Sequence, residues 1–187
     1  MNIVILLGSR NPKGQTARAA AAMAQGAQSA GARTETFYLP LLKIERCRQC
    51  DDSGWGLCRR EGKCVIQDEF AGLVDKLKAA DAAVFATPVY FGDLAESMKA
   101  FTDRLRRTCM HESGKSGIGG KPAVGICVAG GGGGGAQGCT ESLERVLRVC
   151  GCDLVDFVPV RRQNLQMKLE VLGITGKWLA SVKAGQS

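Results

Sequence analysis

The first sixteen residues constrain the fold of this chain more than any other stretch. Residues 3–7 form an unbroken aliphatic run that ends at Gly8, a pattern typical of a parallel strand buried on both faces. A loop with glycines and hydroxyls follows over residues 8–16, and then an alanine-rich stretch over 17–30 that Gly31 should end as a helix. A buried strand, a short loop and a helix in this order predict the start of an α/β fold.

The loop over residues 8–16 is suited to bind an anion. Its backbone N–H groups and the positive end of the following helix should face the carboxyl end of the strand. Ser9, Gln15 and Thr16 can donate hydrogen bonds from their side chains, and Arg10 adds positive charge. The loop lacks the Gly-Lys-Ser/Thr ending of nucleoside-triphosphate loops, and its glycines do not match the dinucleotide fingerprint. Two interpretations stay open, a cradle for one terminal phosphate and an ordinary strand-to-helix turn.

The rest of the chain alternates between strand and helix patterns. Further strands are predicted over residues 33–39, 82–86, 122–128 and 153–160, and helices over 69–79, 96–107, 140–149 and 165–182. This alternation predicts a doubly wound, five-stranded parallel sheet with helices on both faces. We expect one domain over residues 1–187, with a cysteine-containing insertion at 40–66. With the strand order 2-1-3-4-5, a ligand should bind where the order reverses, between the loops 8–16 and 87–93.

The composition narrows the classes of function. The net charge of +7 suits a phosphorylated small molecule or nucleic acid, but aromatics make up only 5% and are not interleaved with basic residues. The one histidine, His111, argues against serine–histidine catalysis and histidine metal sites. No apolar stretch reaches transmembrane length and no basic segment precedes the first apolar run. We therefore expect a cytoplasmic protein without a membrane or nucleic-acid partner, whose nine cysteines are reduced thiols or metal ligands.

Three motifs together resemble a known family. They are Gly8-Ser9-Arg10 through Gly14-Gln15-Thr16, then Thr87-Pro88-Val89-Tyr90-Phe91-Gly92, then Met98-Lys99-Ala100-Phe101-Thr102-Asp103-Arg104. In order and spacing the chain is similar to the flavodoxin-like NAD(P)H-dependent FMN reductases over residues 1–135. The resemblance implies a flavodoxin-like fold, tightly held FMN and NAD(P)H as reductant. It also implies FMN contacts from Ser9, Arg10, Gln15 and Thr16 at the phosphate, from Pro88, Val89, Tyr90, Phe91 and Gly92 along the ring edge, and from Gly131, Gly132, Gly133 and Gly134.

The function implied by the resemblance is that of an FMN-dependent oxidoreductase. Electrons would pass from NAD(P)H through FMN to a small acceptor such as a flavin or a quinone, in a homodimer or homotetramer. Because a flavin performs this chemistry itself, the lack of a catalytic triad or carboxylate pair agrees with it. By spacing alone, Tyr90 and Phe91 fit core or loop-anchoring aromatics better, whereas the family motif favours a flavin contact for at least one of them. For Arg104, one interpretation is that it does no more than cover the end of its helix.

Four cysteines, Cys47, Cys50, Cys58 and Cys64, gather within 18 residues of the predicted insertion. They resemble the loop of the iron–sulfur flavoproteins, a branch of the same fold in which four such cysteines hold a 4Fe–4S cluster near FMN. The seven residues between Cys50 and Cys58 depart from that branch, whose third cysteine follows closely. Tetrahedral zinc, a disulfide that exchanges electrons with the flavin, and metal-free surface thiols are the other interpretations.

The cysteine loop leads to an alternative function. An iron–sulfur flavoprotein would act as an electron-transfer protein, taking electrons from a ferredoxin-type donor through the cluster. A third class, a regulatory module that senses a nucleotide or the redox state, shares the fold, and the fold alone does not decide between these functions.

Overall fold

The computed structural model describes residues 1–112 and 116–182 and forms a six-stranded sheet. Five strands run parallel in the order β2-β1-β3-β5-β6, while β4 pairs antiparallel with the end of β3. The strands are β1 (Asn2–Leu7), β2 (Arg33–Tyr38), β3 (Ala82–Tyr90), β4 (Asp93–Leu94), β5 (Pro122–Ala129) and β6 (Asp153–Arg161). The predicted flavodoxin-like order 2-1-3-4-5 is confirmed, and it reverses between β1 and β3.

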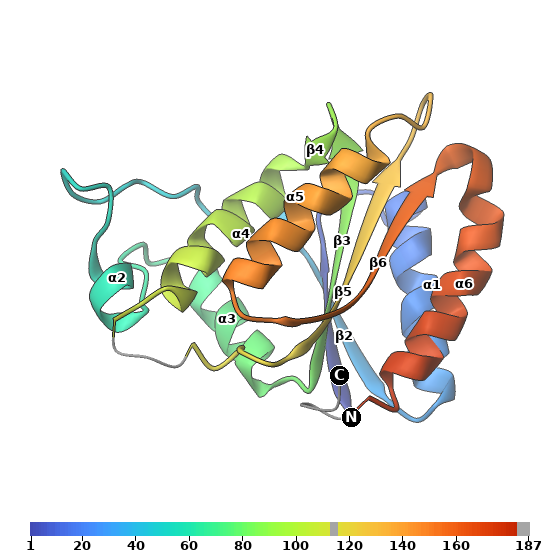
Figure 1. The fold of residues 1–187 in the computed structure, drawn as a ribbon, viewed down its shortest axis with the longest axis horizontal. Helices are drawn as coiled ribbons and strands as arrows, with labels where there is room; N and C mark the ends of the chain where they lie inside the picture. Colours follow the sequence, from blue (N-terminus) through green and yellow to red (C-terminus); the bar gives the residue numbers. More distant parts are fainter. Residues whose placement is uncertain (113–115, 183–187) are drawn as a thin grey trace.

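Helices cover both faces of the sheet (Figure 1). They are α1 (Gln15–Ser29), α2 (Leu57–Glu61), α3 (Phe70–Ala79), α4 (Glu96–Cys109), α5 (Ala136–Val149) and α6 (Leu165–Leu179), with short 3₁₀ turns at Leu39–Leu41 and Arg162–Asn164. Two apolar clusters separate the layers, one under α1 and α6 and one under α3, α4 and α5. Strand β1 contributes to both, because its successive side chains alternate between the faces. This explains why its sequence is an unbroken apolar run.

The segment between residues 42 and 69 leaves the sheet and projects beside α4, and it contains the short helix α2 (Figure 1). It returns to the core at Phe70, the first residue of α3. Within residues 1–112 and 116–182, no helix has the length and apolar character needed to cross a bilayer.

The loop predicted over residues 87–93 is wrong in part, because β3 continues to Tyr90 and turns back into β4. The turn consists of Phe91 and Gly92, which have φ angles of 51° and 80°. Two successive positive φ angles match the right-handed twist of a two-residue hairpin. Helix α5 also begins earlier than predicted, at Ala136, directly after the left-handed Gly135.

Candidate functional site

Three loops meet at the carboxyl edge of the sheet and line one cleft. The loop after β1 contributes Gln15 and Thr16, the end of β3 contributes Pro88, Val89 and Tyr90, and β5 and its loop contribute Val128, Ala129, Gly130, Gly131 and Gly134. The cleft therefore lies at the point where the strand order reverses, as the sequence predicts. Of the residues predicted to bind FMN, seven line it: Gln15, Thr16, Pro88, Val89, Tyr90, Gly131 and Gly134.

The ends of β1 and β3 are joined tightly beneath this cleft. Gly8 donates its N–H to the Ala86 carbonyl at 2.8 Å, and a Cβ at Gly8 would lie 3.2 Å from Thr87 Oγ1. Ser97 Oγ donates to the Gly8 carbonyl at 3.3 Å, and the Ala95 N–H donates to Thr87 Oγ1 at 3.1 Å. These contacts fix the start of α4 against the first loop. Ser97 was not predicted as part of the site, because its partner lies 89 positions away.

The first loop has the features of an anion cradle. Asn11 shapes it by accepting the Gly14 N–H on its carbonyl at 3.1 Å and the Lys13 N–H on Oδ1 at 3.0 Å. Helix α1 begins without a side-chain cap and without an acidic residue in its first turn, so its N-terminal dipole faces the cleft uncompensated. Thr16 is buried there. The buried Oε1 atom of Gln15 has no hydrogen-bond partner and can only accept, so an anion would be bound by the Nε2 donor of this side chain. Asn11 could have been recognised as a turn residue from its Asn-Pro dipeptide.

The glycine loop after β5 approaches the β3–β4 hairpin backbone to backbone. A Cβ at Gly135, whose φ is 80°, would lie 2.7 Å from Gly92 Cα. On the other side, Gln163 Nε2 donates to the Gly132 carbonyl at 3.1 Å. Figure 1 shows this loop and the hairpin at the same end of the sheet. The glycines therefore allow a close approach that side chains would block.

The other predicted contacts lie outside the cleft. Ser9 is half-buried, Arg10 is exposed, and Gly132 and Gly133 line a neighbouring depression on the far side of their loop. Phe91 is fully exposed at the hairpin tip, and Gly92 beside it faces Gly135. A phenylalanine with a positive φ is strained, and such strain is found at functional loops. The roles predicted for these residues stay predictions.

The four cysteines of the projecting segment line a single second pocket. Cys47, Cys50, Cys58 and Cys64 border it together with apolar residues that include Trp55, Leu57 and Ile66. The backbone turns sharply between the first two thiols, because Gln49 has a φ of 53°. A metal or cluster site requires its cysteine ligands to face one shared space, and these four cysteines do so.

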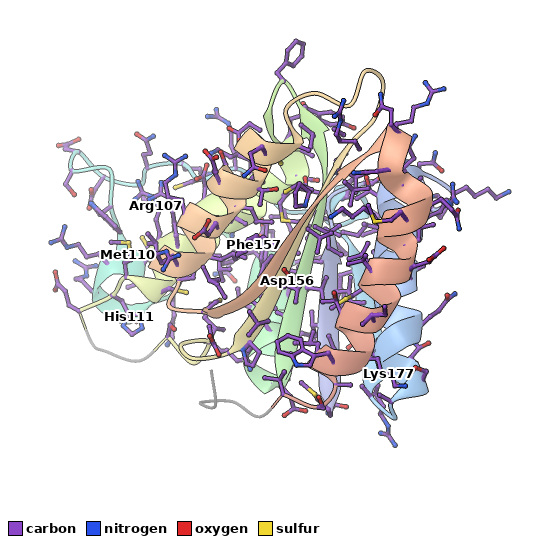
Figure 2. The ribbon with its side chains drawn as sticks, turned by 45° about the vertical axis from the view of Figure 1, so that its right-hand side comes forward. Arg107, Met110, His111, Asp156, Phe157 and Lys177 are labelled. Carbon is purple, nitrogen blue, oxygen red and sulfur yellow. The ribbon has the colours of Figure 1, made fainter. Side chains whose placement is uncertain are left out.

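The seven residues between Cys50 and Cys58 form a compact turn. The Asp51 carboxylate accepts the N–H groups of Ser53 at 3.0 Å and of Trp55 at 2.9 Å, and the Asp51 carbonyl accepts the Gly54 N–H at 2.8 Å. Arg107 of α4 donates to the Gly54 carbonyl at 2.6 Å, and its guanidinium lies 4.6 Å from the centre of the Trp55 ring. Figure 2 shows Arg107 on α4 facing this segment. Because residues 51–57 form this compact turn, Cys58 lies at the same pocket as the other three cysteines.

The thiols are arranged more widely than one metal ion requires. Desolvation by the neighbouring atoms, followed by the nearby thiols of Cys64, Cys47 and Cys58, raises the pKa of the exposed Cys50. Among the described residues, however, no three cysteine, histidine or acidic side chains stand close enough to share one ion. A zinc site needs four sulfurs at about 2.3 Å from one centre. Four cysteine thiolates are also the ligand set of a 4Fe–4S cluster, which is larger than one ion and is held from the outside.

Arg104 is part of this pocket and not a cover for a helix end, so that interpretation is wrong. Its side chain is 1% exposed and forms a two-pronged ion pair with Asp68, NH1 to Oδ2 at 2.6 Å and NH2 to Oδ1 at 2.9 Å. Burial opposes ionisation of Asp68, but hydrogen bonds from Arg104 and from the backbone of Glu45 and Phe70 outweigh it and lower its pKa.

The other five cysteines lie away from the pocket. Cys127, Cys139 and Cys150 are buried in the core. Burial, and then the neighbouring Cys109, raises the pKa of the half-buried Cys152 to about 12. The Cys152 thiol therefore stays protonated at neutral pH, which makes it a poor metal ligand.

Comparisons with known proteins agree with the fold. The family model described as NADPH-dependent FMN reductase matches residues 1–163. An iron–sulfur flavoprotein of Methanocaldococcus jannaschii is 30% identical over 131 residues, and one of Methanosarcina thermophila is 29% identical over 132 residues. The matches cover 70% and 69% of this chain but 65% and 63% of those relatives, so the chain spans about two thirds of their length.

Solved structures show the same fold at lower identity. The NAD(P)H:quinone oxidoreductase from Methanothermobacter marburgensis superposes with a TM-score of 0.71 at 18% identity, covering 96% of both chains.

Proposed function

Because this chain belongs to the NADPH-dependent FMN reductase family, we propose that it is an FMN-dependent oxidoreductase that passes electrons from NAD(P)H to a small acceptor such as a flavin or a quinone. The observation that carries the proposal is the convergence of three loops on one cleft at the β1–β3 switch point. In this cleft the uncompensated N-terminus of α1 and the glycine backbone after β5 face the same space.

FMN is the cofactor of this family, and when bound it supplies the hydride and electron chemistry. The chain's residues would hold and orient it. Thr16, Gln15 and the first turn of α1 would donate to the phosphate, with Ser9 and Arg10 bordering it. The backbone from Pro88 to Gly92 would lie along the ring edge. The glycines from Gly131 to Gly134 have no Cβ, so a flat ring can approach the backbone closely.

The test of the proposal is turnover of the FMN-loaded protein under anaerobic conditions. Loaded protein should oxidise NADPH or NADH and then be reoxidised by a quinone or free flavin in a separate half-reaction. A protein that holds FMN but is reduced by neither nucleotide would contradict the choice of reductant and leave the cofactor assignment standing. A bound but redox-silent flavin would favour the regulatory module.

A second candidate function is favoured by the cysteine pocket. In this candidate, Cys47, Cys50, Cys58 and Cys64 hold a 4Fe–4S cluster, and the protein transfers electrons from a ferredoxin-type donor to FMN. Support comes from the four thiols on one pocket and from relatives that are named iron–sulfur flavoproteins. The cluster would supply one-electron chemistry, and the cysteines would be its ligands.

Two measurements separate the candidates. The electron-transfer candidate expects iron and acid-labile sulfide in anaerobically purified protein, with slow direct oxidation of NAD(P)H. Metal-free protein with fast NADPH turnover would contradict it and support the first candidate. A homodimer or homotetramer in the cytoplasm is part of both proposals, and sedimentation of the FMN-loaded protein tests the assembly.

A further inference from the structure

Arg104 joins the two ends of the cysteine segment. One terminal nitrogen, NH1, donates to the Glu45 carbonyl at 3.0 Å, just before Cys47. The other, NH2, donates to the Ile66 carbonyl at 3.5 Å, just after Cys64. Both nitrogens also bind the Asp68 carboxylate. The segment that carries all four thiols is therefore closed at its base by one guanidinium.

The contacts around this guanidinium restrict its movement. It lies 4.2 Å from the centre of the Phe70 ring, and that ring packs against Phe101 at a centroid distance of 5.4 Å. Asp68 is itself held, because its Oδ2 accepts the Glu45 N–H at 2.8 Å and its Oδ1 accepts the Phe70 N–H at 3.1 Å. A planar fork that is stacked and bound on both prongs has little freedom to rotate.

One donor of Arg104 is left over. Its Nε atom is buried and has no hydrogen-bond partner, although the side chain lines the pocket of the four thiols. Burial alone would lower the pKa of Arg104, but its hydrogen bonds to Asp68 and the nearby Cys64 thiol raise it. A buried N–H without a partner costs about 1–3 kcal/mol. Such a cost is expected where a group is reserved for a ligand.

We propose that Arg104 is the positioning residue of the cysteine pocket, fixing both ends of the thiol-bearing segment with its terminal nitrogens and offering Nε–H to a sulfur held in the pocket. The first role is independent of any metal. The second rests on the iron–sulfur candidate, because hydrogen bonds to sulfur and nearby positive charge raise the reduction potential of such clusters.

The experiment compares Arg104→Lys and Arg104→Gln with the matched control Arg106→Gln. Arg106 lies on the same helix, and it pairs with Asp103 at 3.3 Å with both side chains about one third exposed. Lysine keeps the charge at position 104 but cannot bridge both carbonyls and has no Nε–H. The Arg104→Lys variant therefore still tests the proposal if Arg104→Gln does not fold.

The first readout needs no metal. The chain has two tryptophans, so Trp178→Phe leaves Trp55 in the pocket as the only reporter. In that background, Arg104→Lys should raise acrylamide quenching of Trp55 roughly twofold or more, because the segment opens locally. Arg106→Gln should leave the quenching of Trp55 unchanged. Unchanged quenching in Arg104→Lys would overturn the positioning role.

The second readout uses protein reconstituted with iron and sulfide. Arg104→Lys should lose iron to a chelator roughly tenfold faster, as is typical when a residue that orients metal ligands is replaced. Its midpoint potential, measured by an EPR-monitored titration, should shift to a more negative value, while that of Arg106→Gln stays at the wild-type value. An unchanged potential would overturn the role of Nε.

Wild-type protein that takes up no iron would contradict both the iron–sulfur candidate and the role of Nε. The quenching of Trp55 would still test the positioning role, because that measurement needs no metal.

Discussion

Ser97 and Arg104 lie seven residues apart on α4, about 10 Å along the helix axis, and each contacts a different loop. Ser97 donates to the Gly8 carbonyl beneath the cleft, and Arg104 closes the cysteine segment. The buried residues between them, including Met98 and Phe101, pack into one apolar cluster. Helix α4 therefore holds the two candidate sites at a fixed separation.

Thr16 should contribute directly to phosphate binding. The Thr16→Ala variant should weaken FMN binding roughly 10- to 100-fold, since a hydrogen bond to a charged group contributes about 1.5–3 kcal/mol. Quenching of FMN fluorescence measures the Kd. Thr175→Ala is the control, because Thr175 is a buried threonine on α6 that donates to Asp156 at 3.5 Å, away from the cleft. Equal losses in both variants would contradict the assignment.

Gly135 should be intolerant of a side chain for two separable reasons. Gly135→Ala places a Cβ in a left-handed residue and 2.7 Å from Gly92 Cα. Gly31→Ala imposes the same backbone strain at a φ of 86° with no atom within 4 Å. We expect about 1–3 kcal/mol of destabilisation from strain in both, and a further loss with weaker FMN binding only in Gly135→Ala. Urea denaturation and FMN titration measure the two effects, and identical results for the two variants would refute the contact.

Asp68 should make stability depend on pH in the acid range. Its pKa is lowered in the folded state, so its contribution is complete above the ordinary aspartate pKa of about 3.9 and is lost as pH falls below it. Asp68→Asn should cost about 3–5 kcal/mol at pH 7, because it leaves Arg104 buried without a counter-charge. The control Asp103→Asn, in a pair that is about one third exposed, should cost under about 1 kcal/mol. Urea denaturation at several pH values is the measurement, and an acid slope that persists in Asp68→Asn would argue against this origin.

Cys50 should be required for iron binding if the second candidate is correct. Cys50→Ser should remove most iron and acid-labile sulfide, because serine is a poor replacement for a terminal thiolate ligand of iron. Cys152→Ser should retain both, since Cys152 lies outside the pocket. Iron analysis after anaerobic reconstitution distinguishes the Cys50→Ser variant from the Cys152→Ser variant. Equal iron in Cys50→Ser and wild type would show that the metal, if present, is held elsewhere.

Local patterns were enough to predict the sheet and most of the cleft. The apolar run of β1, the glycine loop after β5 and the spacing of the helices predicted the strand order and brought Gln15, Thr16 and Tyr90 to the correct edge. The β3–β4 hairpin was missed because its turn begins with Phe91, whereas Asn or Asp usually precedes glycine in such turns.

Contacts between residues that are far apart in the sequence could not be predicted from local sequence patterns. Arg104 and Asp68 are 36 positions apart, and nothing in the spacing of either residue indicates a buried pair. The same holds for Ser97 and Gly8. In each case the partner is chosen by the way α4 packs on the sheet, which is a property of the whole fold.

The central claim is that the cleft between the β1, β3 and β5 loops holds FMN. The most direct measurement is a titration of purified protein with FMN, followed by flavin fluorescence and by the visible spectrum under anaerobic conditions. We predict saturable binding of one FMN per chain, weakened in Thr16→Ala and unchanged in Thr175→Ala. Protein that is purified without flavin and takes up none in the titration would contradict the account.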